Sequence, residues 1–517
     1  MDLFIKTAML VVFFASMIGV GIYCRKKSTD VDGFVLGGRS VGPWLTAFAY
    51  GTSYFSAVVF VGYAGQFGWK FGIAATWAGI GNALLGSLLA WAVLGRRTRV
   101  MSQHLGSATM PQFFEARYGQ KGLKLAASVV IFVFLIPYTA SLYNGLSRLF
   151  GMAFDIDYSV CVIAMAVLTA VYVIAGGYMA TAINDFIQGI IMIAGIIAVI
   201  AAVLNKQGGL MEAVAQMGQV TDGQSAPGAY SSFFGPDPAG LLGVVLLTSF
   251  GTWGLPQMVQ KFYAIKNEKA ITKGMVISTL FALLVAGGCY FLGGFGRLFT
   301  TQEAVNAGGF DSIIPTMLSG LSPVLIGIVV VLVLSASMST LSSLVLASSS
   351  TLTLDLIKDT LVKKMSEKKQ ILVIRVLIAV FIAISVVIAL VQYKSNVTFI
   401  AQLMGVSWGA LAGAFLAPFL FGLYWKRATA ASVWVSMIFS SVVMIANIFW
   451  GKTYFPPLLA SPINCGAFCM LAGLVIVPVV SLISKAPEKE FVEKVFSCYD
   501  KKVVVSARDA IGEPVEE

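Results

Sequence analysis

The sequence predicts an all-α protein that crosses a membrane many times. Hydrophobic residues make up 58% of the 517 positions and charged residues 11%, whereas soluble domains average about 45–50% and about 25%. The mean hydropathy is +0.87, and a soluble chain of this length has too little interior to bury so much apolar surface. The apolar residues also gather in runs of about 20, the length that a helix needs to span a bilayer. These observations exclude a soluble enzyme, a disordered chain and a disulfide-rich secreted domain.

Thirteen apolar runs reach spanning length, and we expect each to form a transmembrane helix. They are residues 4–24, 45–69, 71–94, 122–150, 158–176, 183–205, 240–262, 272–295, 323–357, 371–393, 398–424, 429–450 and 463–484. Basic residues crowd into alternate loops, for example Arg96, Arg97 and Arg99, and are sparse in the others. Because cytoplasmic loops carry an excess of Lys and Arg, we expect a plasma-membrane protein, as in a bacterial inner membrane, with its N-terminus outside and its C-terminus in the cytoplasm.

The composition offers little material for catalysis or for a transition-metal site. His104 is the one histidine, and the cysteines are scattered. Cys465 and Cys469 form a C-x-x-x-C pair that matches no common metal spacing. No Walker sequence appears, so this chain alone is not expected to use ATP. We therefore expect no catalytic residues, no organic cofactor and no enzymatic activity.

Two of the expected spans are interrupted by residues that weaken helices. Residues 49–57 of the second span contain Gly51, and residues 248–257 of the seventh contain Gly251 and Pro256. Glycine and proline free backbone carbonyls, which lipid tolerates only beside a cavity or a partner. One such segment alone is better explained by glycine-mediated packing. The two lie five spans apart and therefore run in opposite directions, which predicts an inverted repeat with a binding site where the breaks meet.

This repeat divides the chain into five parts. Residues 1–44 form an extra N-terminal transmembrane helix and a cytoplasmic loop, and residues 45–239 form the first five-helix repeat with an outer loop. Residues 240–428 form the second, inverted repeat, and residues 429–484 add two transmembrane helices. Residues 485–517 form a cytoplasmic tail that is too short for a further domain.

Hydroxyl side chains form a stripe on the ninth span. Ser335, Ser339, Ser342 and Ser343 follow the spacing of one helix face. Each hydroxyl could simply bond to a carbonyl of its own helix. The alternative is a cation site, because a hard cation such as sodium binds oxygen ligands. Hydroxyls and carbonyls freed at a helix break supply such ligands without fixed charge.

Asp185 is the one acidic residue packed within apolar sequence on both sides. An intramembrane carboxylate is a functional candidate by default, although Asp185 could instead be an N-cap or first-turn acid of the sixth span. No dense Lys or Arg cluster lies within the spans, and Arg148 is expected to snorkel near the outer end of the fourth. The site is therefore not expected to hold a multiply charged anion.

Several short motifs resemble one known family. They are Leu-Gly-Gly-Arg-Ser at 36–40, Ala-Gly-Gly-Tyr at 175–178, Gly-Leu-Pro-Gln at 254–257 and Ser-Met-Ser-Thr-Leu-Ser at 337–342. From about residue 4 to 430 the sequence resembles the sodium:solute symporters, including the proline and pantothenate permeases. The resemblance implies a LeuT-like 5+5 inverted repeat with broken first and sixth core helices. It also implies sodium-coupled import of a small organic solute by alternating access.

The resemblance also implies positions for the coupling ion. A first sodium site would use backbone oxygens of Thr52, Phe55 and Ala336 and the hydroxyls of Ser339 and Thr340. Some relatives hold a second sodium with the residues that match Asp185, Ser339, Ser342 and Ser343. Sodium is thus the expected coupling ion, with one or two ions per cycle.

The expected solute is an amino acid such as proline, or a monocarboxylate or pantothenate-like compound. Tyr54 replaces an Asp of the proline permeases, and Thr248 and Thr252 replace aromatic residues. The side chains expected to line the pocket, unless they serve only in packing, are Tyr54, Ser56, Asn82, Tyr138, Thr252, Trp253 and Gln257. The expected partners are sodium, the solute and the lipid bilayer, with no nucleic acid, and a monomer is expected to suffice. Alternatives are a proton-coupled transporter of the same fold that uses Asp185, or a channel or sensor with a transporter-like domain.

Overall fold

The structure is a computed structural model that describes residues 2–24, 30–154, 157–362, 365–395 and 400–499. Every named element in these residues is a helix, and one isolated β-bridge joins Val41 to Ile265. The predicted all-α class is therefore confirmed. Of the expected tail, residues 500–517 lie outside the described residues, and the part before them forms α21 (Lys489–Phe496) and η11 (Ser497–Tyr499).

Ten helical runs in the described residues are long and apolar enough to cross a membrane, and the bent pair α11 (Pro238–Gly254) and α12 (Pro256–Ala264) makes an eleventh. The runs built on one long helix are α1 (Asp2–Cys24), α8 (Lys121–Phe154), α13 (Glu268–Gly293), α16 (Pro323–Thr351) with its continuation η10 (Leu352–Leu361), α17 (Glu367–Ser395), α18 (Ile400–Tyr424), α19 (Ala430–Tyr454) and α20 (Pro462–Ile483). The finer expectation of thirteen spans stays a prediction.

The segment from α3 to α6, which contains the long apolar run Val58–His104, folds back on itself at Gly72. The contacts of its first arm advance along α13 from Phe281 to Gly293, and those of its second arm return from Gly287 to Ile271. Gly72 has a φ of 62°, and a Cβ there would overlap the carbonyl oxygen of Tyr230, so the reversal requires glycine. The arms consist of α3 (Pro43–Tyr54), η3 (Val58–Tyr63) and α4 (Ala64–Phe71), then η4 (Gly72–Ala75), α5 (Thr76–Gly81), η5 (Asn82–Leu89), η6 (Trp91–Gly95) and α6 (Arg96–His104).

The helical run α9 (Tyr158–Lys206) changes direction in the same way. Gly177 has φ 56° and ψ −151° inside it, a conformation open to glycine. Just before this kink Gly176 packs against Gly21 of α1, and beyond it Asn184 donates to the carbonyl oxygen of Met17. The chain therefore returns along α1, toward the N-terminal end of that helix.

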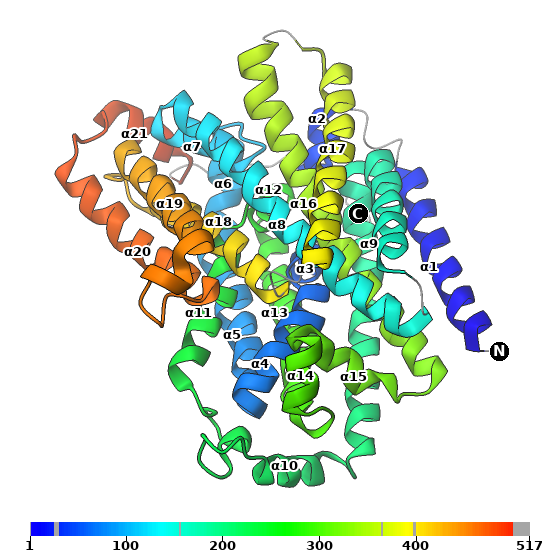
Figure 1. Cartoon of the computed structure of the whole chain (residues 1–517). Coiled ribbons are helices and arrows are strands. Elements are labelled where there is room, and N and C mark those ends of the chain that lie inside the picture. Colours follow the sequence, from blue (N-terminus) through cyan, green and yellow to red (C-terminus); the bar gives the residue numbers. More distant parts are fainter. Residues whose placement is uncertain (1, 25–29, 155–156, 363–364, 396–399, 500–517) are drawn as a thin grey trace.

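The short helices gather at the two opposite ends of the long ones (Figure 1). One end carries α10 (Leu210–Gln219), η7 (Ala229–Ser231), η8 (Gly296–Leu298), α14 (Gln302–Gly308), η9 (Phe310–Ser312) and α15 (Ile313–Ser319). The other carries α2 (Val31–Leu36), η2 (Gly37–Arg39), α6, α7 (Met110–Tyr118) and α21. The arginines of α6 and Arg117 of α7 therefore lie at the same end.

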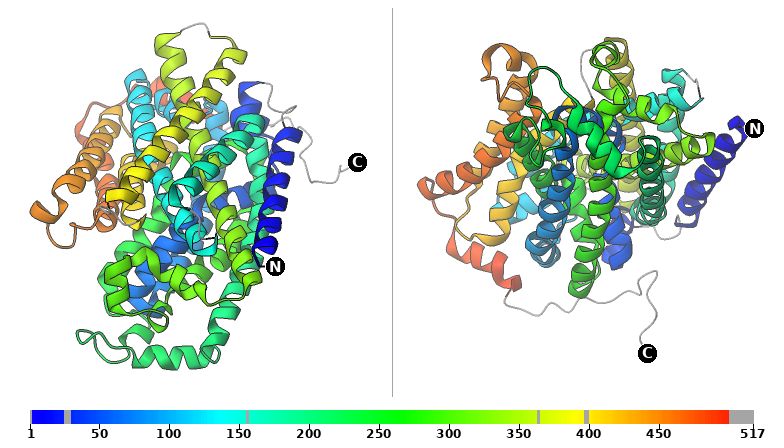
Figure 2. Two further views of the ribbon diagram at one scale, coloured as in Figure 1. Left: turned by 45° about the vertical axis from the view of Figure 1, so that its right-hand side comes forward. Right: turned by 90° about the horizontal axis from the view of Figure 1, so that it is seen from below.

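Two helices form the centre of the bundle. In the most apolar stretch of 18 residues, 89% of the residues of α18 and 78% of those of the α16 run are buried. The corresponding share is 22% in α1 and 39% in both α19 and α20. Figure 2 shows α1 at one edge and α19 and α20 at the other. The polar face predicted on the ninth span, which is α16, is therefore directed into protein and not toward lipid.

Candidate functional site

Both expected helix breaks are present. After α3 the backbone is extended at Phe55 (φ −85°, ψ 127°), and after α11 it is extended at Leu255 (φ −82°, ψ 125°). The helices on either side of Leu255 meet at 48°. The two glycines themselves lie inside the helices, because a Cβ at Gly51 would overlap Phe281 and one at Gly251 would lie 2.6 Å from Trp408. They permit close packing, and each break follows four residues later.

The break after α3 meets the hydroxyl stripe of α16. Thr340 Oγ1 lies 3.2 Å from the carbonyl oxygen of Thr52, 3.1 Å from that of Phe55 and 3.0 Å from that of Ala336. Ser339 Oγ lies 3.1 Å from the carbonyl oxygen of Thr52 and 3.0 Å from that of Ala336. All five residues are fully buried. The structure thus brings together the five oxygens that the resemblance implied for a first sodium site.

The chemistry of this oxygen cluster suits a small hard cation. Such ions take oxygen ligands at roughly 2.3–2.6 Å, which places neighbouring ligands roughly 3.3–3.7 Å apart around an octahedron. The hydroxyl oxygens of Ser339 and Thr340 are 3.0–3.2 Å from the carbonyl oxygens, because each hydroxyl donates to a carbonyl. A small increase in the distances between these oxygens, together with rotation of both hydroxyl groups, would turn all five oxygens toward one ion.

Asp185 lies eight residues beyond the kink at Gly177, inside the second arm of α9, and it is fully buried. It is therefore not an N-cap or first-turn acid. Its Oδ2 lies 3.8 Å from Nζ of Lys261 on α12, and that ammonium donates to Ser343 Oγ at 3.0 Å. Ser342, by contrast, donates to a carbonyl of its own helix, that of Ser339.

Lys261 was not among the residues predicted from the sequence. This lysine is the second-last residue of the seventh apolar run, residues 240–262. A charged residue at that place is normally interpreted as the end of a span. Its side chain is buried all the same. The rule that a buried membrane charge needs a partner could have paired it with Asp185.

Five of the seven expected pocket residues carry a buried polar atom that makes no close hydrogen bond to any described residue. These residues are Tyr54, Ser56, Asn82, Tyr138 and Gln257. The other two are already bonded, since Thr252 donates to the carbonyl oxygen of Gly86 at 3.0 Å and Trp253 donates to that of Leu85 at 2.9 Å. Buried polar groups are rarely left unpaired, so the first five are the better candidates for contact with a polar solute.

The same region contains aromatic residues that the sequence analysis did not select. The Trp408 ring of α18 lies 5.7 Å from the Tyr54 ring and 5.9 Å from the Tyr138 ring. Tyr290 of α13 lies beside Tyr54 and Asn82. The Tyr290 hydroxyl and the Trp408 indole nitrogen are buried and make no close hydrogen bond to a described residue, although the Tyr138 hydroxyl lies near the indole nitrogen. Aromatic residues are common in membrane helices, so no sequence signal distinguished these two.

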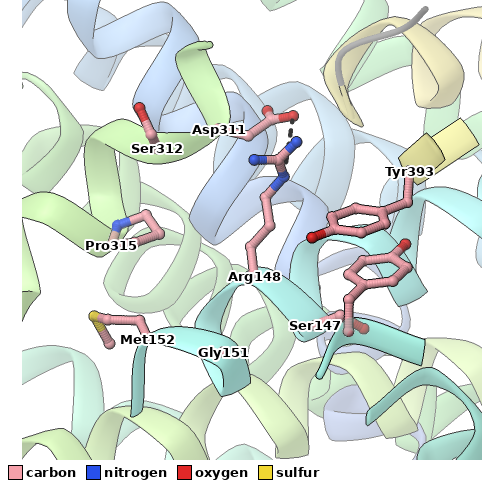
Figure 3. Close-up of a pocket in the computed structure, with 9 residues that line it drawn as sticks. Ser147, Arg148, Gly151, Met152, Asp311, Ser312, Pro315 and Tyr393 are labelled. Atoms are coloured by element: carbon pink, nitrogen blue, oxygen red, sulfur yellow. Dashed lines mark ion pairs between the residues drawn. The ribbon is translucent and has the colours of Figure 1, made fainter. Parts of the chain in front are cut away.

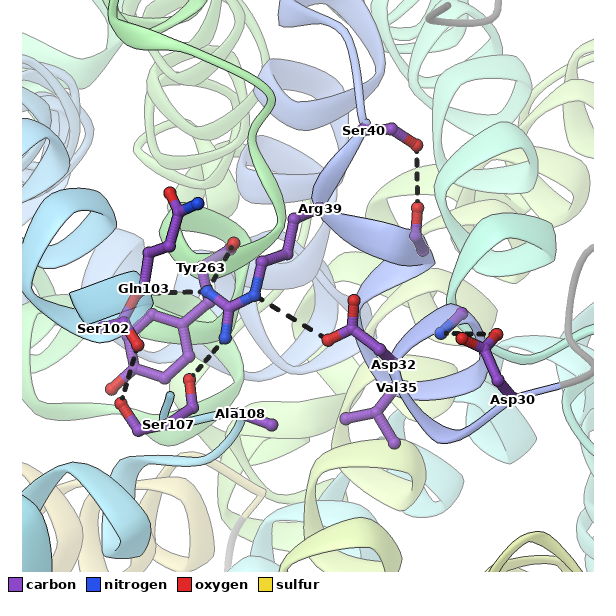
Figure 4. Close-up of polar contacts among 12 residues, drawn as sticks. Asp30, Asp32, Val35, Arg39, Ser40, Ser102, Gln103, Ser107, Ala108 and Tyr263 are labelled. Carbon is purple, nitrogen blue, oxygen red and sulfur yellow. Dashed lines mark hydrogen bonds and ion pairs between the residues drawn. The ribbon is translucent and has the colours of Figure 1, made fainter. Parts of the chain in front are cut away.

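At the end of the molecule that carries α6, a polar cluster surrounds Arg39 (Figure 4). Arg39 donates to the carbonyl oxygen of Ser107 at 2.7 Å and to Ser102 Oγ at 3.3 Å, and its Nε lies 3.7 Å from Asp32. Burial lowers the pKa of the Arg39 guanidinium, and the Asp32 carboxylate opposes that shift. Beside it, the backbone of Val41 accepts from the N–H of Lys266 at 3.1 Å. The ends of the two broken helices are therefore tied together.

At the opposite end a pocket of about 260 Å³ opens beside Arg148 (Figure 3). The Arg148 guanidinium lies 4.0 Å from Asp311, so it is paired with a carboxylate. The rings of Tyr158 and Tyr393 stack at 3.8 Å along one side. This pocket contains none of the expected ion or solute residues.

The model of the sodium:solute symporter family matches residues 34–440. The chain is 31% identical over 494 residues to a sodium/proline symporter of Staphylococcus aureus strain JH9, which covers 93% of this chain and 92% of that protein. Proteins of the same name from strains JH1 and Mu3 match equally.

Two solved structures are similar in fold. A Na⁺-coupled sialic acid symporter in a substrate-bound outward-open state aligns with a TM-score of 0.73 at 17% identity, over 94% of this chain and 99% of that one. Mhp1, a transporter of the nucleobase-cation-symport-1 family, aligns with a TM-score of 0.50 at 14% identity, over 89% and 97%. These relatives are transporters and not enzymes. The chain belongs to the sodium:solute symporter family of sodium-coupled membrane transporters.

Proposed function

We propose that this protein imports a small organic solute together with sodium, and that the ion binds between Thr52, Phe55, Ala336, Ser339 and Thr340. The cluster of these five buried oxygens, with separations of 3.0–3.2 Å between the hydroxyl and carbonyl oxygens, carries the proposal. It joins the break after α3 to α16, two elements that are far apart in the sequence.

We infer thirteen spans arranged as a LeuT-like 5+5 inverted repeat. The reversals at Gly72 and Gly177 divide two long runs into two arms each, which supports this count. The repeats would comprise residues 45–239 and 240–428, with 1–44 and 429–484 outside them. The end with the α6 arginines would face the cytoplasm, which places the N-terminus outside and the C-terminal tail inside.

The breaks would couple the two ligands. Along the chain, the carbonyls of Thr52 and Phe55 face the ion, whereas Tyr54 and Ser56 have buried hydroxyls without partners. Sodium that orders the first pair therefore also orders the second. Two ligands that both prefer the same conformation raise each other's affinity, and this coupling is what a symporter needs.

The chemistry of the candidate pocket favours a small zwitterion or carboxylate, such as proline. The polar groups of the candidate pocket residues are neutral hydroxyls and amides beside aromatic rings, and the amides are those of Asn82 and Gln257. In broken membrane helices, the exposed helix ends attract charged ligand groups. The relative that is a sodium/proline symporter favours the same class, whereas Tyr54, Thr248 and Thr252 depart from the proline-permease pattern.

The test is uptake by purified protein in proteoliposomes with a sodium gradient, across a panel of amino acids and monocarboxylates. Uptake should require sodium and should stop when potassium replaces it. Uptake driven by a pH gradient without sodium would instead identify the proton-coupled alternative that uses Asp185. Flux far above transporter turnover would identify a channel.

A further inference from the structure

A buried ion pair lies where four helical elements meet. Lys261 on α12 is 1% exposed and Asp185 on α9 is 0% exposed, and Nζ lies 3.8 Å from Oδ2. The ammonium also donates to Ser343 Oγ on α16 at 3.0 Å, and Ser343 Oγ lies 2.8 Å from Oγ of Ser53 on α3. The ring of Tyr178 lies 5.1 Å from Nζ.

This ion pair is next to the proposed sodium site. Ser343 follows Thr340 by three residues, one turn farther along α16, and Ser53 follows Thr52 directly. The ammonium of Lys261 therefore lies between the carboxylate of Asp185 and the hydroxyl of Ser343, two of the four groups expected to hold a second sodium.

The charges do not favour two cations at this position. Among the described residues, the carboxylate that pairs with Lys261 is that of Asp185. With the ammonium of Lys261 as the one cation beside the Asp185 carboxylate, the two charges cancel and the position is neutral. A sodium ion added beside the ammonium would leave a net positive charge inside the protein, one helical turn from the first sodium, and buried charges need a compensating partner.

We propose that the ammonium of Lys261 is the resident cation of the second position, so that the cycle moves one sodium ion per solute. The inference deepens the proposed symport and rests on it. The amino group stays attached to α12, so it binds the same oxygens as an ion but is not released. It therefore holds α12 to α9 and α16 and contributes nothing to coupling.

Equilibrium binding of ²²Na⁺ to the purified full-length protein tests this directly. The wild type should bind one sodium per chain. Lys261→Met removes the cation but leaves Asp185 and Ser343, so it should bind two. The double variant Lys261→Met/Asp185→Asn is neutral at both positions and should return to one, and Lys261→Arg should also keep one. Reversal potentials in proteoliposomes should give ratios of one for the wild type and two for Lys261→Met.

Two sodium ions bound to the wild type, with one of them lost in Asp185→Asn, would overturn the proposal. A single ion in Lys261→Met that is unaffected by Asp185→Asn would overturn it as well. If Lys261→Met does not fold, Asp185→Asn in the wild-type background decides the question, because it keeps a ratio of one under the proposal and lowers two to one otherwise. A wild type that binds no sodium would contradict the proposed symport itself.

Discussion

Replacement of Thr340 by valine tests the first ion site most directly. Valine keeps the shape of threonine and removes only Oγ1, which contacts the carbonyl oxygens of Thr52, Phe55 and Ala336 within 3.0–3.2 Å. The variant leaves four of the five candidate ligands in place. The break after α3 and the helix α16 should therefore keep their positions.

The expected loss of sodium affinity follows from the two states that the hydroxyl serves. A polar group bonded to a charge contributes about 1.5–3 kcal/mol. Without the ion, the Thr340 hydroxyl has one hydrogen to donate, so it makes at most one full hydrogen bond, worth about 1 kcal/mol. At about 1.4 kcal/mol per tenfold, we expect the half-saturating sodium concentration to rise roughly tenfold, and further in the Ser339→Ala/Thr340→Val double variant.

The assay is the sodium dependence of solute uptake in proteoliposomes, together with thermal stabilisation by sodium over potassium. Ser337→Ala is the matched control, because Ser337 Oγ donates to the Val333 carbonyl of its own helix at 2.8 Å. It should change the sodium dependence less than about twofold. An unchanged sodium dependence in Thr340→Val would refute the assignment of this site.

Three further changes test the solute pocket, the fold and the polar cluster around Arg39. Gln257→Leu should raise the half-saturating solute concentration about tenfold in uptake assays, because it deletes unpaired buried groups. Gly72→Ala should lower the melting temperature strongly through overlap with Tyr230, whereas Gly106→Ala, with a φ of 63° in open space, should cost only about 1–2 kcal/mol. Arg39→Gln should speed hydrogen exchange at the end of α12, measured by mass spectrometry, because Arg39 donates to the carbonyl oxygen of Tyr263 near that end at 3.5 Å.

The candidate first ion site could be proposed from the sequence, through the resemblance, because its five residues lie in two short segments. Ser339 and Thr340 are consecutive residues of α16, and the carbonyls of Thr52 and Phe55 lie at one break. Helix periodicity and glycine chemistry act within a few residues, so both parts can be recognised before the fold is known. The choice of these five residues, and the expectation that they meet across the molecule, came from the resemblance to the sodium:solute symporters.

The remaining features depend on tertiary neighbours. Thr252 and Trp253 were chosen for the pocket from their position beside a break, but η5 supplies carbonyl partners for both. Trp408 was not chosen, because nothing in its own segment indicates that Gly251 leaves room for its ring. Which polar groups remain unpaired is decided by packing between segments, which one sequence does not encode locally.

Lys261 has a consequence for the energetics of the whole cycle. A membrane potential of about 100 mV contributes roughly 2.3 kcal/mol for each charge that moves inward. Under the proposed assignment the Lys261–Asp185 pair is neutral and one sodium ion is the added charge, so a zwitterionic solute would be concentrated by one sodium gradient and one charge equivalent of potential. Two ions would double both contributions. Because a buried lysine can replace a mobile ion, residue types that match the second site do not by themselves fix the coupling ratio, and the charge balance around Asp185 has to be considered with them.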